Sequence, residues 1–264
     1  MRTHTHRATP HRCALPGVAA MTLSSSHAFP RHSHDEFGIG VMLSGAQRSW
    51  SVVGQVEAVA GEVIMVNPGE IHDGMAVGER RAWRIAYLDP AILRRAAAEE
   101  SDAEVIARPV ARDAGLARRV ERFFSLLDDP DPEAAEEILM ACLARVVDRH
   151  GVQGSRKRPP SPGVAPAVSR LDDAPEVPAT LSELASLCGS SRFQLIRGFT
   201  REVGTTPHAY ALQRRARLAR RLLRTGLSPA EAATAAGFAD QSHMTRAFAR
   251  HFGITPARYR DAFP

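Results

Sequence analysis

Two short runs of side chains in the last third of the sequence could bond to the edges of DNA bases. An arginine can bind guanine through two N–H groups, a glutamine can pair with adenine, and an apolar group can contact the methyl group of thymine. An outward phenylalanine or isoleucine would be unfavourable on a helix that faces only water. For any one of these side chains, the alternative is an ordinary solvated surface. The first run contains Phe193, Gln194, Ile196 and Arg197, and the second contains Gln241, Ser242, His243, Thr245 and Arg246.

These runs belong to two copies of one motif that lie 49 residues apart. The segments RGFTREVGTTPHAY (197–210) and RAFARHFGITPARY (246–259) are identical at seven positions at this offset, including a glycine and a proline. Such a repeat implies that one supersecondary unit is built twice. Each copy reads as a helix of small residues, a glycine turn and a second helix, so we predict helix-turn-helix units over 181–202 and 229–251.

The apolar spacing predicts which side of each second helix is buried. Leu195 and Phe199 lie four residues apart in the first copy, and Met244 and Phe248 do the same in the second. Residues with this spacing share one helix face, so the polar runs lie on the opposite face.

The positive charge is concentrated in the repeat region. Residues 170–264 contain 14 Arg and 8 acidic residues, a net charge of +6, whereas residues 1–169 carry a net charge of −1. Between the two units we predict one helix over 208–224, which fixes them relative to each other. Its arginines either bind DNA phosphates or are solvated. The residues expected to face inward are Tyr210, Leu212, Ala216, Ala219 and Leu223, and those expected to face outward are Arg214, Arg215, Arg217, Arg220, Arg221 and Arg224.

The segment GFADQSHMTRAFARHFGITPARYR, residues 237–260, resembles the signature of the AraC/XylS family of bacterial transcriptional regulators. By that resemblance, the last 95 or so residues form a tandem helix-turn-helix domain whose recognition helices enter successive major grooves of promoter DNA. Two departures concern the first helix: Ile196 replaces a residue that is more often polar, and Gly198 costs about 1 kcal/mol relative to alanine. The resemblance also implies a regulator that is more often an activator than a repressor, with RNA polymerase, a small-molecule effector and a second copy of the chain as partners.

Three histidines in the first third could converge on a metal ion. The segments HSHDE and NPGEIHDG contain His32, His34 and His72, and they resemble the two cupin motifs. Alternation along a strand directs His32 and His34 to the same face, where three imidazoles could hold zinc or iron. The glutamate usual in cupins is absent, because Gly38 and Ile39 occupy its place. The alternative is that these histidines line an effector pocket or are structural. Trp50 and Trp83 are candidate walls of that pocket, or plain core residues.

The domain organisation follows from composition and pattern. Short apolar stretches alternate with glycine turns up to Leu88, and two amphipathic helical patterns follow. We therefore predict an α+β multidomain protein in which a cupin-like β-barrel with an αα-hairpin precedes an all-α tandem helix-turn-helix domain. The predicted ranges are a disordered tail over 1–17, the barrel over 18–90, the hairpin over 91–150 with dimerisation around 123–147, a linker over 151–178 rich in Pro, Gly and Ser, and an AraC-type domain over 168–264.

Composition narrows the class of function. The chain is 44% hydrophobic and 24% charged, which is ordinary for a globular protein, and it has no apolar run long enough to span a membrane. Its three scattered cysteines do not support a disulfide framework and favour a reducing cytoplasm. Two hypotheses remain: a non-enzymatic, ligand-responsive transcription factor, and a metal-dependent cupin enzyme whose helical region only tethers it to DNA. The missing cupin glutamate favours the first.

Overall fold

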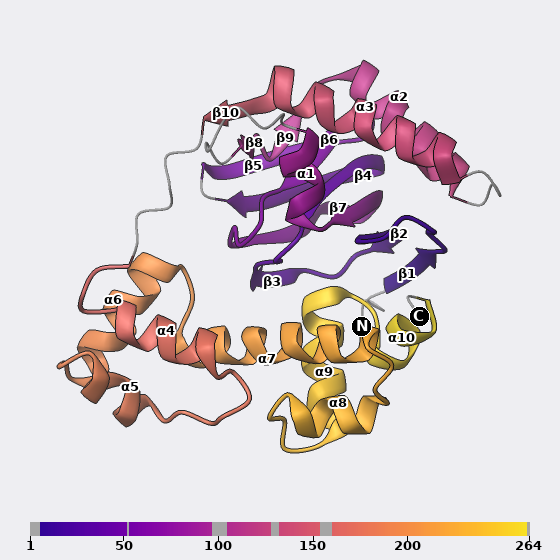
Figure 1. The fold of residues 1–264 in the computed structure, drawn as a ribbon. Coiled ribbons are helices and arrows are strands. Elements are labelled where there is room, and N and C mark those ends of the chain that lie inside the picture. The colour runs from indigo at the N-terminus through magenta and orange to yellow at the C-terminus, as the bar shows by residue number, and fades with distance from the viewer. Residues whose placement is uncertain (1–5, 52, 97–104, 128–131, 154–159, 263–264) are drawn as a thin grey trace. The chain divides into compact units, whose positions relative to one another are not determined.

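The computed structural model describes residues 6–51, 53–96, 105–127, 132–153 and 160–262. The chain divides into two compact units, Met1–Arg156 and Lys157–Pro264. The first contains an antiparallel sheet with helices, and the second consists of helices (Figure 1). The predicted fold class is confirmed. None of the described helices combines the length and the apolar character needed to cross a lipid bilayer.

One long strand, β7 (His72–Leu88), organises the sheet of the first unit. It pairs antiparallel with three other strands, and the longest of them, β4 (Phe37–Ser51), pairs in turn with two more. The partners of β7 are β2 (Val18–Ser25), β3 (Phe29–His32) and β4, and the further partners of β4 are β5 (Gly54–Val59) and β6 (Val63–Val66). The edges of the sheet are β1 (His6–His11) beside β2 and β9 (Val110–Ala111) beside β6.

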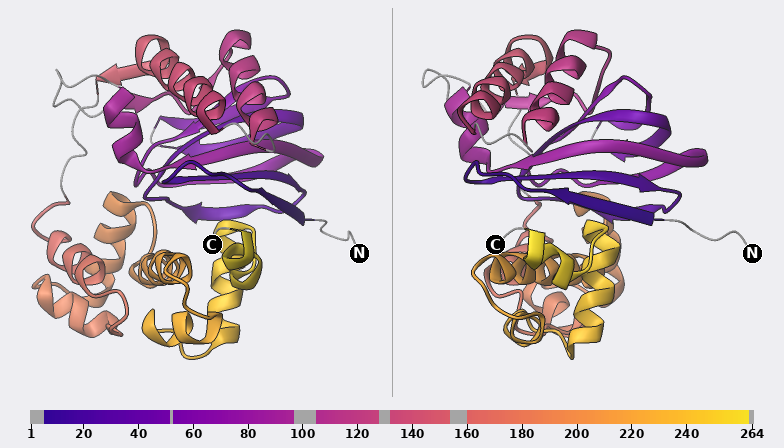
Figure 2. Two further views of the ribbon diagram at one scale, coloured as in Figure 1. Left: turned by 45° about the vertical axis from the view of Figure 1, so that its right-hand side comes forward. Right: turned by 90° about the vertical axis from the view of Figure 1, so that its right-hand side faces the viewer.

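Helices pack against one face of this sheet. They are α1 (Pro90–Ala96), α2 (Ala114–Leu126) and α3 (Pro132–His150), and Figure 2 shows α2 and α3 side by side across the strands. Alternate residues of β4 point toward them, because side chains alternate between the faces of a strand. The resulting core contains Phe37, Ile39 and Val41 of β4, Leu116, Val120 and Phe123 of α2, and Leu139, Leu143 and Val146 of α3.

Asp113 ties the start of α2 to the end of α3. Its carboxylate accepts the N–H of Leu116, at 3.0 Å, and thereby caps α2. It also accepts two bonds from Arg145, at 2.8 and 2.9 Å, and lies 2.9 Å from His150 Nε2. The hydrogen bonds from Arg145 hold the pKa of Asp113 well below its usual range. The two helices of the hairpin are therefore joined by charge as well as by their apolar core.

The side-chain amide of Asn67, which follows β6, links the main sheet to a separate pair of short strands. Asn67 donates to the carbonyl oxygen of Ala107 at 2.9 Å and accepts its N–H at 2.8 Å. Ala107 ends β8 (Val105–Ala107), which pairs antiparallel with β10 (Gly151–Gln153). Asn67 thus completes the hydrogen bonds of a short strand whose edge would otherwise be open.

The prediction of a disordered tail over 1–17 is wrong for its described residues, because His6–His11 form β1. This strand pairs with β2 from His6, opposite Ser25, to His11, opposite Ala20. His11 Nε2 lies 2.8 Å from Thr22 Oγ1, and Ala8 is buried. Pro10 is tolerated because β1 is an edge strand. Polar residues that looked like a solvated tail bond instead to polar residues of β2.

A bulge between β4 and β7 buries an arginine. Ser44 pairs with Ala82 and Ala46 with Val77, so residues 78–81 lie opposite the single residue Gly45. Gly45 has φ +69°, and a Cβ there would overlap the main-chain oxygen of Arg80, so only glycine fits.

The bulge turns Arg81 inward, where it is 0% exposed. Its guanidinium donates to Gln47 Oε1 at 2.8 Å and to the carbonyl oxygens of His27 and Gly74 at 3.1 and 3.2 Å. It also lies 4.8 Å from the centre of the Trp83 ring. Burial lowers the pKa of Arg81 to about 10, which leaves it charged at neutral pH. One cation therefore joins β4, β7 and the loop between β2 and β3.

The second unit contains seven described helices: α4 (Ala165–Asp173), α5 (Leu181–Leu187), α6 (Arg192–Val203), α7 (Pro207–Arg224), α8 (Pro229–Ala235), α9 (Gln241–Phe252) and α10 (Pro256–Ala262). The range predicted as a linker, 151–178, includes both β10 and α4. Helix α4 forms because its apolar residues Ala167 and Leu171 are buried in one core with Leu184, Leu195 and Phe199. A proline in its first turn is compatible with a helix start.

Helix α7 lies between the two helical pairs and contacts α4, α6, α8, α9 and α10 (Figure 1). Its residues Ala216, Ala219 and Leu223 are buried as predicted. The prediction that its arginines face outward is wrong for Arg217 and Arg220, which are 4% and 6% exposed. A helix that is packed on so many sides has little open face, so some of its basic residues must lie inside.

These arginines and their neighbours anchor α7. The guanidinium of Arg220 lies 4.8 Å from the centre of the Phe252 ring. Arg214 forms an ion pair with Asp172 at 2.9 Å, and the hydroxyl of Tyr210 donates to the same carboxylate at 2.8 Å. Arg215 donates through Nε to the carbonyl oxygen of Pro175 at 2.8 Å.

We expect Arg81→Met to lower the free energy of unfolding by about 2–4 kcal/mol, because it removes three hydrogen bonds of a fully buried guanidinium. Urea unfolding followed by tryptophan fluorescence measures this loss, since both tryptophans lie in the first unit. The matched control is Arg80→Met, at an exposed neighbour whose Nε donates to Ser24 Oγ at 2.7 Å. Equal losses in the two variants would contradict the anchoring role of Arg81.

Candidate functional site

The repeated motif builds two helical pairs with the same capping at their starts. In α5 the N–H of Thr180 bonds Glu183 at 2.6 Å while Thr180 Oγ1 accepts the N–H of Glu183 at 3.2 Å. In α8 Ser228 and Glu231 form the same reciprocal pair, at 2.8 and 3.3 Å. These bonds lower the pKa of both glutamates. The capping boxes fix where each pair begins.

The second helix of each pair begins with its own cap and ends at a glycine. In α6 the side chain of Gln194 accepts the N–H of Ser191 at 2.9 Å, so this predicted base-reading residue is partly engaged by its own helix. In α9 Asp240 accepts the N–H of His243 at 2.6 Å. Gly204 and Gly253, which end the two helices with φ of 82° and 68°, are again 49 residues apart. The repeat in the sequence is therefore a repeat of helix starts and ends.

The predicted buried faces of these helices are confirmed. Leu195 and Phe199 of α6 are 1% and 0% exposed, and Met244 and Phe248 of α9 are both 0% exposed. Gly198 also has a packing reason, because a Cβ there would lie 3.3 Å from Val164 Cγ2. Glycine is unfavourable inside a helix, but at this position it allows α6 to lie close to Val164, just before α4.

The opposite face of α6 is exposed and unusually apolar. Phe193 is 67% exposed and Ile196 is 36% exposed. The guanidinium carbon of Arg197 lies 5.6 Å from the centre of the Phe193 ring, one helical turn away. This contact places the arginine over the ring while its side chain stays exposed.

The corresponding face of α9 is more polar. Gln241, Ser242 and Arg246 are exposed, whereas His243 and Thr245 are partly buried. The ring of His243 meets that of Phe238 edge to face, with 5.3 Å between centroids. The structure therefore brings all nine predicted side chains onto the two outward helix faces, although Gln194 and His243 are partly engaged within the protein.

The turn of the second pair contacts the main chain of the segment that precedes the first pair. Gly237 has φ +75°, and a Cβ at this position would overlap the carbonyl oxygen of Glu176, which lies between α4 and α5. Only glycine permits this approach, so Gly237 contributes to the fixed position of one pair relative to the other.

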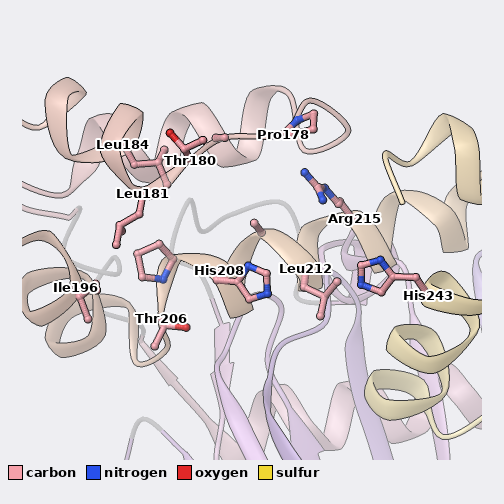
Figure 3. A pocket seen from close by; sticks show the side chains of 13 residues that line it. Pro178, Thr180, Leu181, Leu184, Ile196, Thr206, His208, Leu212, Arg215 and His243 are labelled. Atoms are coloured by element: carbon pink, nitrogen blue, oxygen red, sulfur yellow. The ribbon is translucent and has the colours of Figure 1, made fainter. Parts of the chain in front are cut away.

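A groove of about 400 Å³ lies between the two outward faces. Figure 3 shows that Ile196 of α6 and His243 of α9 stand at opposite sides of it, with His208, Leu212 and Arg215 of α7 between them. His208 was not among the predicted site residues, and its place at the start of the predicted helix over 208–224 was the available signal. The two candidate base-reading faces therefore open onto one continuous surface.

In the first unit the three predicted histidines converge. The ring centroids of His32 and His34 lie 4.8 Å apart, those of His32 and His72 4.4 Å, and those of His34 and His72 5.1 Å. Candidate ligand atoms of all three lie within 4.8 Å of one another. Strand β3 ends at His32, which pairs with His72, so the following loop rather than strand alternation directs His34 to this place.

The two tryptophans have different surroundings. Trp83 is 6% exposed and packs between Arg81 and Phe29, whose ring centroid lies 6.1 Å away. Trp50 is half-buried under the guanidinium of Arg31, at 4.1 Å. Tyr87, which the sequence analysis did not select, lies nearer to the histidines, at 4.9 Å from the ring of His34. Its alternation with Trp83 and Ile85 along RAWRIAYL was the signal.

Two family models match the chain. An "AraC-like ligand binding domain" matches residues 17–143, and a "Helix-turn-helix domain" matches residues 184–262. Together they cover the histidine cluster and the two outward helix faces.

Known proteins with similar sequences include regulators of transcription. The HTH-type transcriptional regulator YbfI of Bacillus subtilis is 29% identical over 224 residues, which is 82% of this chain and 81% of YbfI. The transcriptional activator NphR of a Rhodococcus species is 44% identical over 82 residues, or 31% of this chain and 24% of NphR. Among solved structures, ToxT of Vibrio cholerae covers 100% of this chain and 99% of its own with a TM-score of 0.54 and 9% identity, so this likeness concerns the fold.

One histidine of α9 should make the second unit sensitive to acid. Burial, with help from Arg250 and Arg217, lowers the pKa of His251 to about 4. An unfolded chain takes up this proton near pH 6.5, so the unfolded state binds more protons between pH 6.5 and 4, and stability falls as the pH falls through that window.

We expect the second unit to lose about 2 kcal/mol of stability between pH 7 and pH 5 through this residue. Urea unfolding followed by helical circular dichroism at both pH values measures the loss, and His251→Gln should remove it. The control is His208→Gln, at an exposed position on α7. A pH slope that is unchanged in His251→Gln would contradict this assignment.

Proposed function

We propose that this chain, which belongs to the AraC family of DNA-binding transcriptional regulators controlled by a ligand, activates transcription. In this proposal α6 and α9 lie in successive major grooves of promoter DNA. The observation that carries the proposal is the pair of outward faces, 49 residues apart, each opposite a fully buried apolar stripe. A helix fixed by its buried face can present its other face to base edges.

The two helices are suited to different bases. In α6, Phe193 and Ile196 offer apolar contacts for thymine methyl groups, and Arg197 beside them can bond guanine. In α9, Gln241 and Arg246 can bond adenine and guanine, while Ser242, His243 and Thr245 can bond either base edges or the adjacent backbone. Gln194 contributes through the amide N–H groups that its capping bond leaves available.

The groove between the helices would face the DNA backbone between the two major grooves. Its polar members, His208 and Arg215 of α7, can approach phosphates there. The net charge of +6 over residues 170–264 supports this role, because phosphate neutralisation supplies much of the affinity for DNA.

The first unit would receive the effector in the region of His32, His34 and His72, with Trp50 and Trp83 among its walls. We assign dimerisation to the outward faces of α2 and α3, since their inward residues such as Phe123 and Val146 already belong to the core. RNA polymerase would be the partner at the promoter, in the cytoplasm of a bacterium. Family membership supports this regulator over the alternative of a metal-dependent enzyme with a DNA tether.

The test is to recover genomic fragments with the purified full-length protein and to footprint the bound sites near physiological salt. We expect a few sites protected in two stretches about 10–10.5 base pairs apart, on one face of the duplex. Protection spread evenly over all sequences, with a steep dependence on salt, would contradict sequence-specific reading.

On such a site we expect Arg246→Ala to weaken binding by about 1–3 kcal/mol and to relax the preference at one base pair. Titration of the site and of single-base variants by fluorescence anisotropy measures both effects. The matched control is Arg224→Ala, which removes the same charge from an exposed position at the end of α7. If Arg246→Ala weakened binding equally on all sequences, Arg246 would contact phosphate instead of a base.

A further inference from the structure

The three histidines of the first unit come from separate segments that the fold holds in place. His32 ends β3, His72 begins β7, and the two are partners in the register of those strands. The carbonyl oxygen of His34 accepts the N–H of Gly69 at 2.6 Å, which joins its loop to the turn before β7. The cluster is therefore positioned by main-chain bonds rather than by the side chains alone.

The turn before His72 is itself rigidly held. Glu70 accepts the N–H and the side-chain amide of Asn67, at 3.3 and 2.7 Å, and its own N–H bonds the carbonyl oxygen of Asn67 at 3.0 Å. Asn67 also makes its two bonds to Ala107. A site that binds a metal ion tightly needs this kind of support, because small errors in ligand position weaken coordination.

The orientation of two imidazoles is fixed by their Nδ1 atoms. His32 Nδ1 lies 2.7 Å from the carbonyl oxygen of Pro30, and His72 Nδ1 lies 3.0 Å from that of Glu70. A carbonyl oxygen only accepts, so each Nδ1 donates, and in the neutral imidazole Nε2 then keeps a lone pair. Donation of one ring nitrogen to a carbonyl, with the other left to a metal, is the usual state of a metal-binding histidine.

The cluster lies largely inside the first unit. His32 and His34 are 6% and 2% exposed, and His72 is half-buried. Among the described residues, the group whose ligand atoms lie within 4.8 Å of one another consists of these three histidines, with no carboxylate or thiolate. Imidazole is a preferred ligand of zinc, copper, nickel and iron, whereas calcium and magnesium prefer oxygen.

We propose that His32, His34 and His72 bind one divalent transition-metal ion of the zinc type. Three protein ligands leave a place in the coordination sphere for a further donor. This inference deepens the proposed effector site, since it implies that a small molecule entering there can bond the ion through an oxygen or nitrogen atom. It rests on the proposed function only for that last step, because the metal site can be tested without DNA or effector.

The test uses the full-length protein after treatment with a chelator. Titration with Co²⁺, followed by visible absorption, reports ions bound to nitrogen ligands at low coordination number, and equilibrium dialysis with Zn²⁺ gives the stoichiometry. We expect one ion per chain, with the absorption band lost when Zn²⁺ displaces Co²⁺. Less than half an equivalent bound at saturation, or a spectrum that matches the hexaaqua ion, would overturn the proposal.

Variants separate this cluster from other histidines in the sequence. His72→Ala should weaken binding at least about 100-fold, since loss of a ligand exceeds the 10–100-fold effect of losing an outer partner. The matched control, His11→Ala, removes a histidine of β1 that bonds Thr22, and it should bind Co²⁺ as the parent does. Full uptake by a folded His72→Ala protein would overturn the site.

If His72→Ala unfolds, as judged by circular dichroism, His34→Gln replaces it, with the same expected loss and the same overturning result. The footprinting experiment on metal-free protein distinguishes a failure of the metal-site proposal from a failure of the DNA-reading proposal. Specific protection of DNA without stoichiometric metal binding would refute the metal site alone, whereas metal binding without specific protection would refute the DNA-reading proposal alone.

Discussion

The second unit depends on one constraint, which is that α7 keeps two copies of the same helical pair at a fixed separation. A helix of 18 residues is about 27 Å long, which is of the same order as the 34–36 Å between successive major grooves on one face of DNA. The length of α7 sets the separation of the two pairs only if α7 cannot bend or rotate. Its buried Arg217 and Arg220, the bonds from Tyr210 and Arg214 to Asp172, and the close approach of Gly237 to Glu176 supply that rigidity.

Much of this unit could be predicted from the sequence, because its signals are local. Each signal involves only a few neighbouring residues: a glycine that ends a helix, a helix of small residues, and the four-residue spacing of Leu195 and Phe199. The repeat contains each of these signals twice. The inward turn of Arg217 and Arg220 could not be predicted, since it depends on helices that arrive from distant parts of the chain. Gln194 illustrates a subtler limit: its residue type suits a base edge, but its position three residues after Ser191 also suits a capping box.

The first unit was less predictable because antiparallel sheets bring together residues far apart in the sequence. Arg80 and Arg81 are the same residue type, and the sequence does not distinguish them. In the fold, Arg80 is exposed and Arg81 is buried at the bulge opposite Gly45. The same applies to β1, which could not be predicted because its polar residues form a strand only by pairing with β2. The three histidines were predictable as a set from their spacing, whereas the support of the cluster by Asn67, Gly69 and Glu70 was visible only in the fold.

The two bonds between Asn67 and Ala107 have a mechanical consequence. The turn that contains Asn67 leads directly into His72, and Ala107 belongs to the strand that pairs with β10, which ends three residues before the first unit itself ends. Any displacement of this turn must either carry β8 and β10 with it or break both bonds. A displacement of the turn beside the histidines would therefore act on β8 and β10, either as a pull on this strand pair or as the loss of one of its anchors.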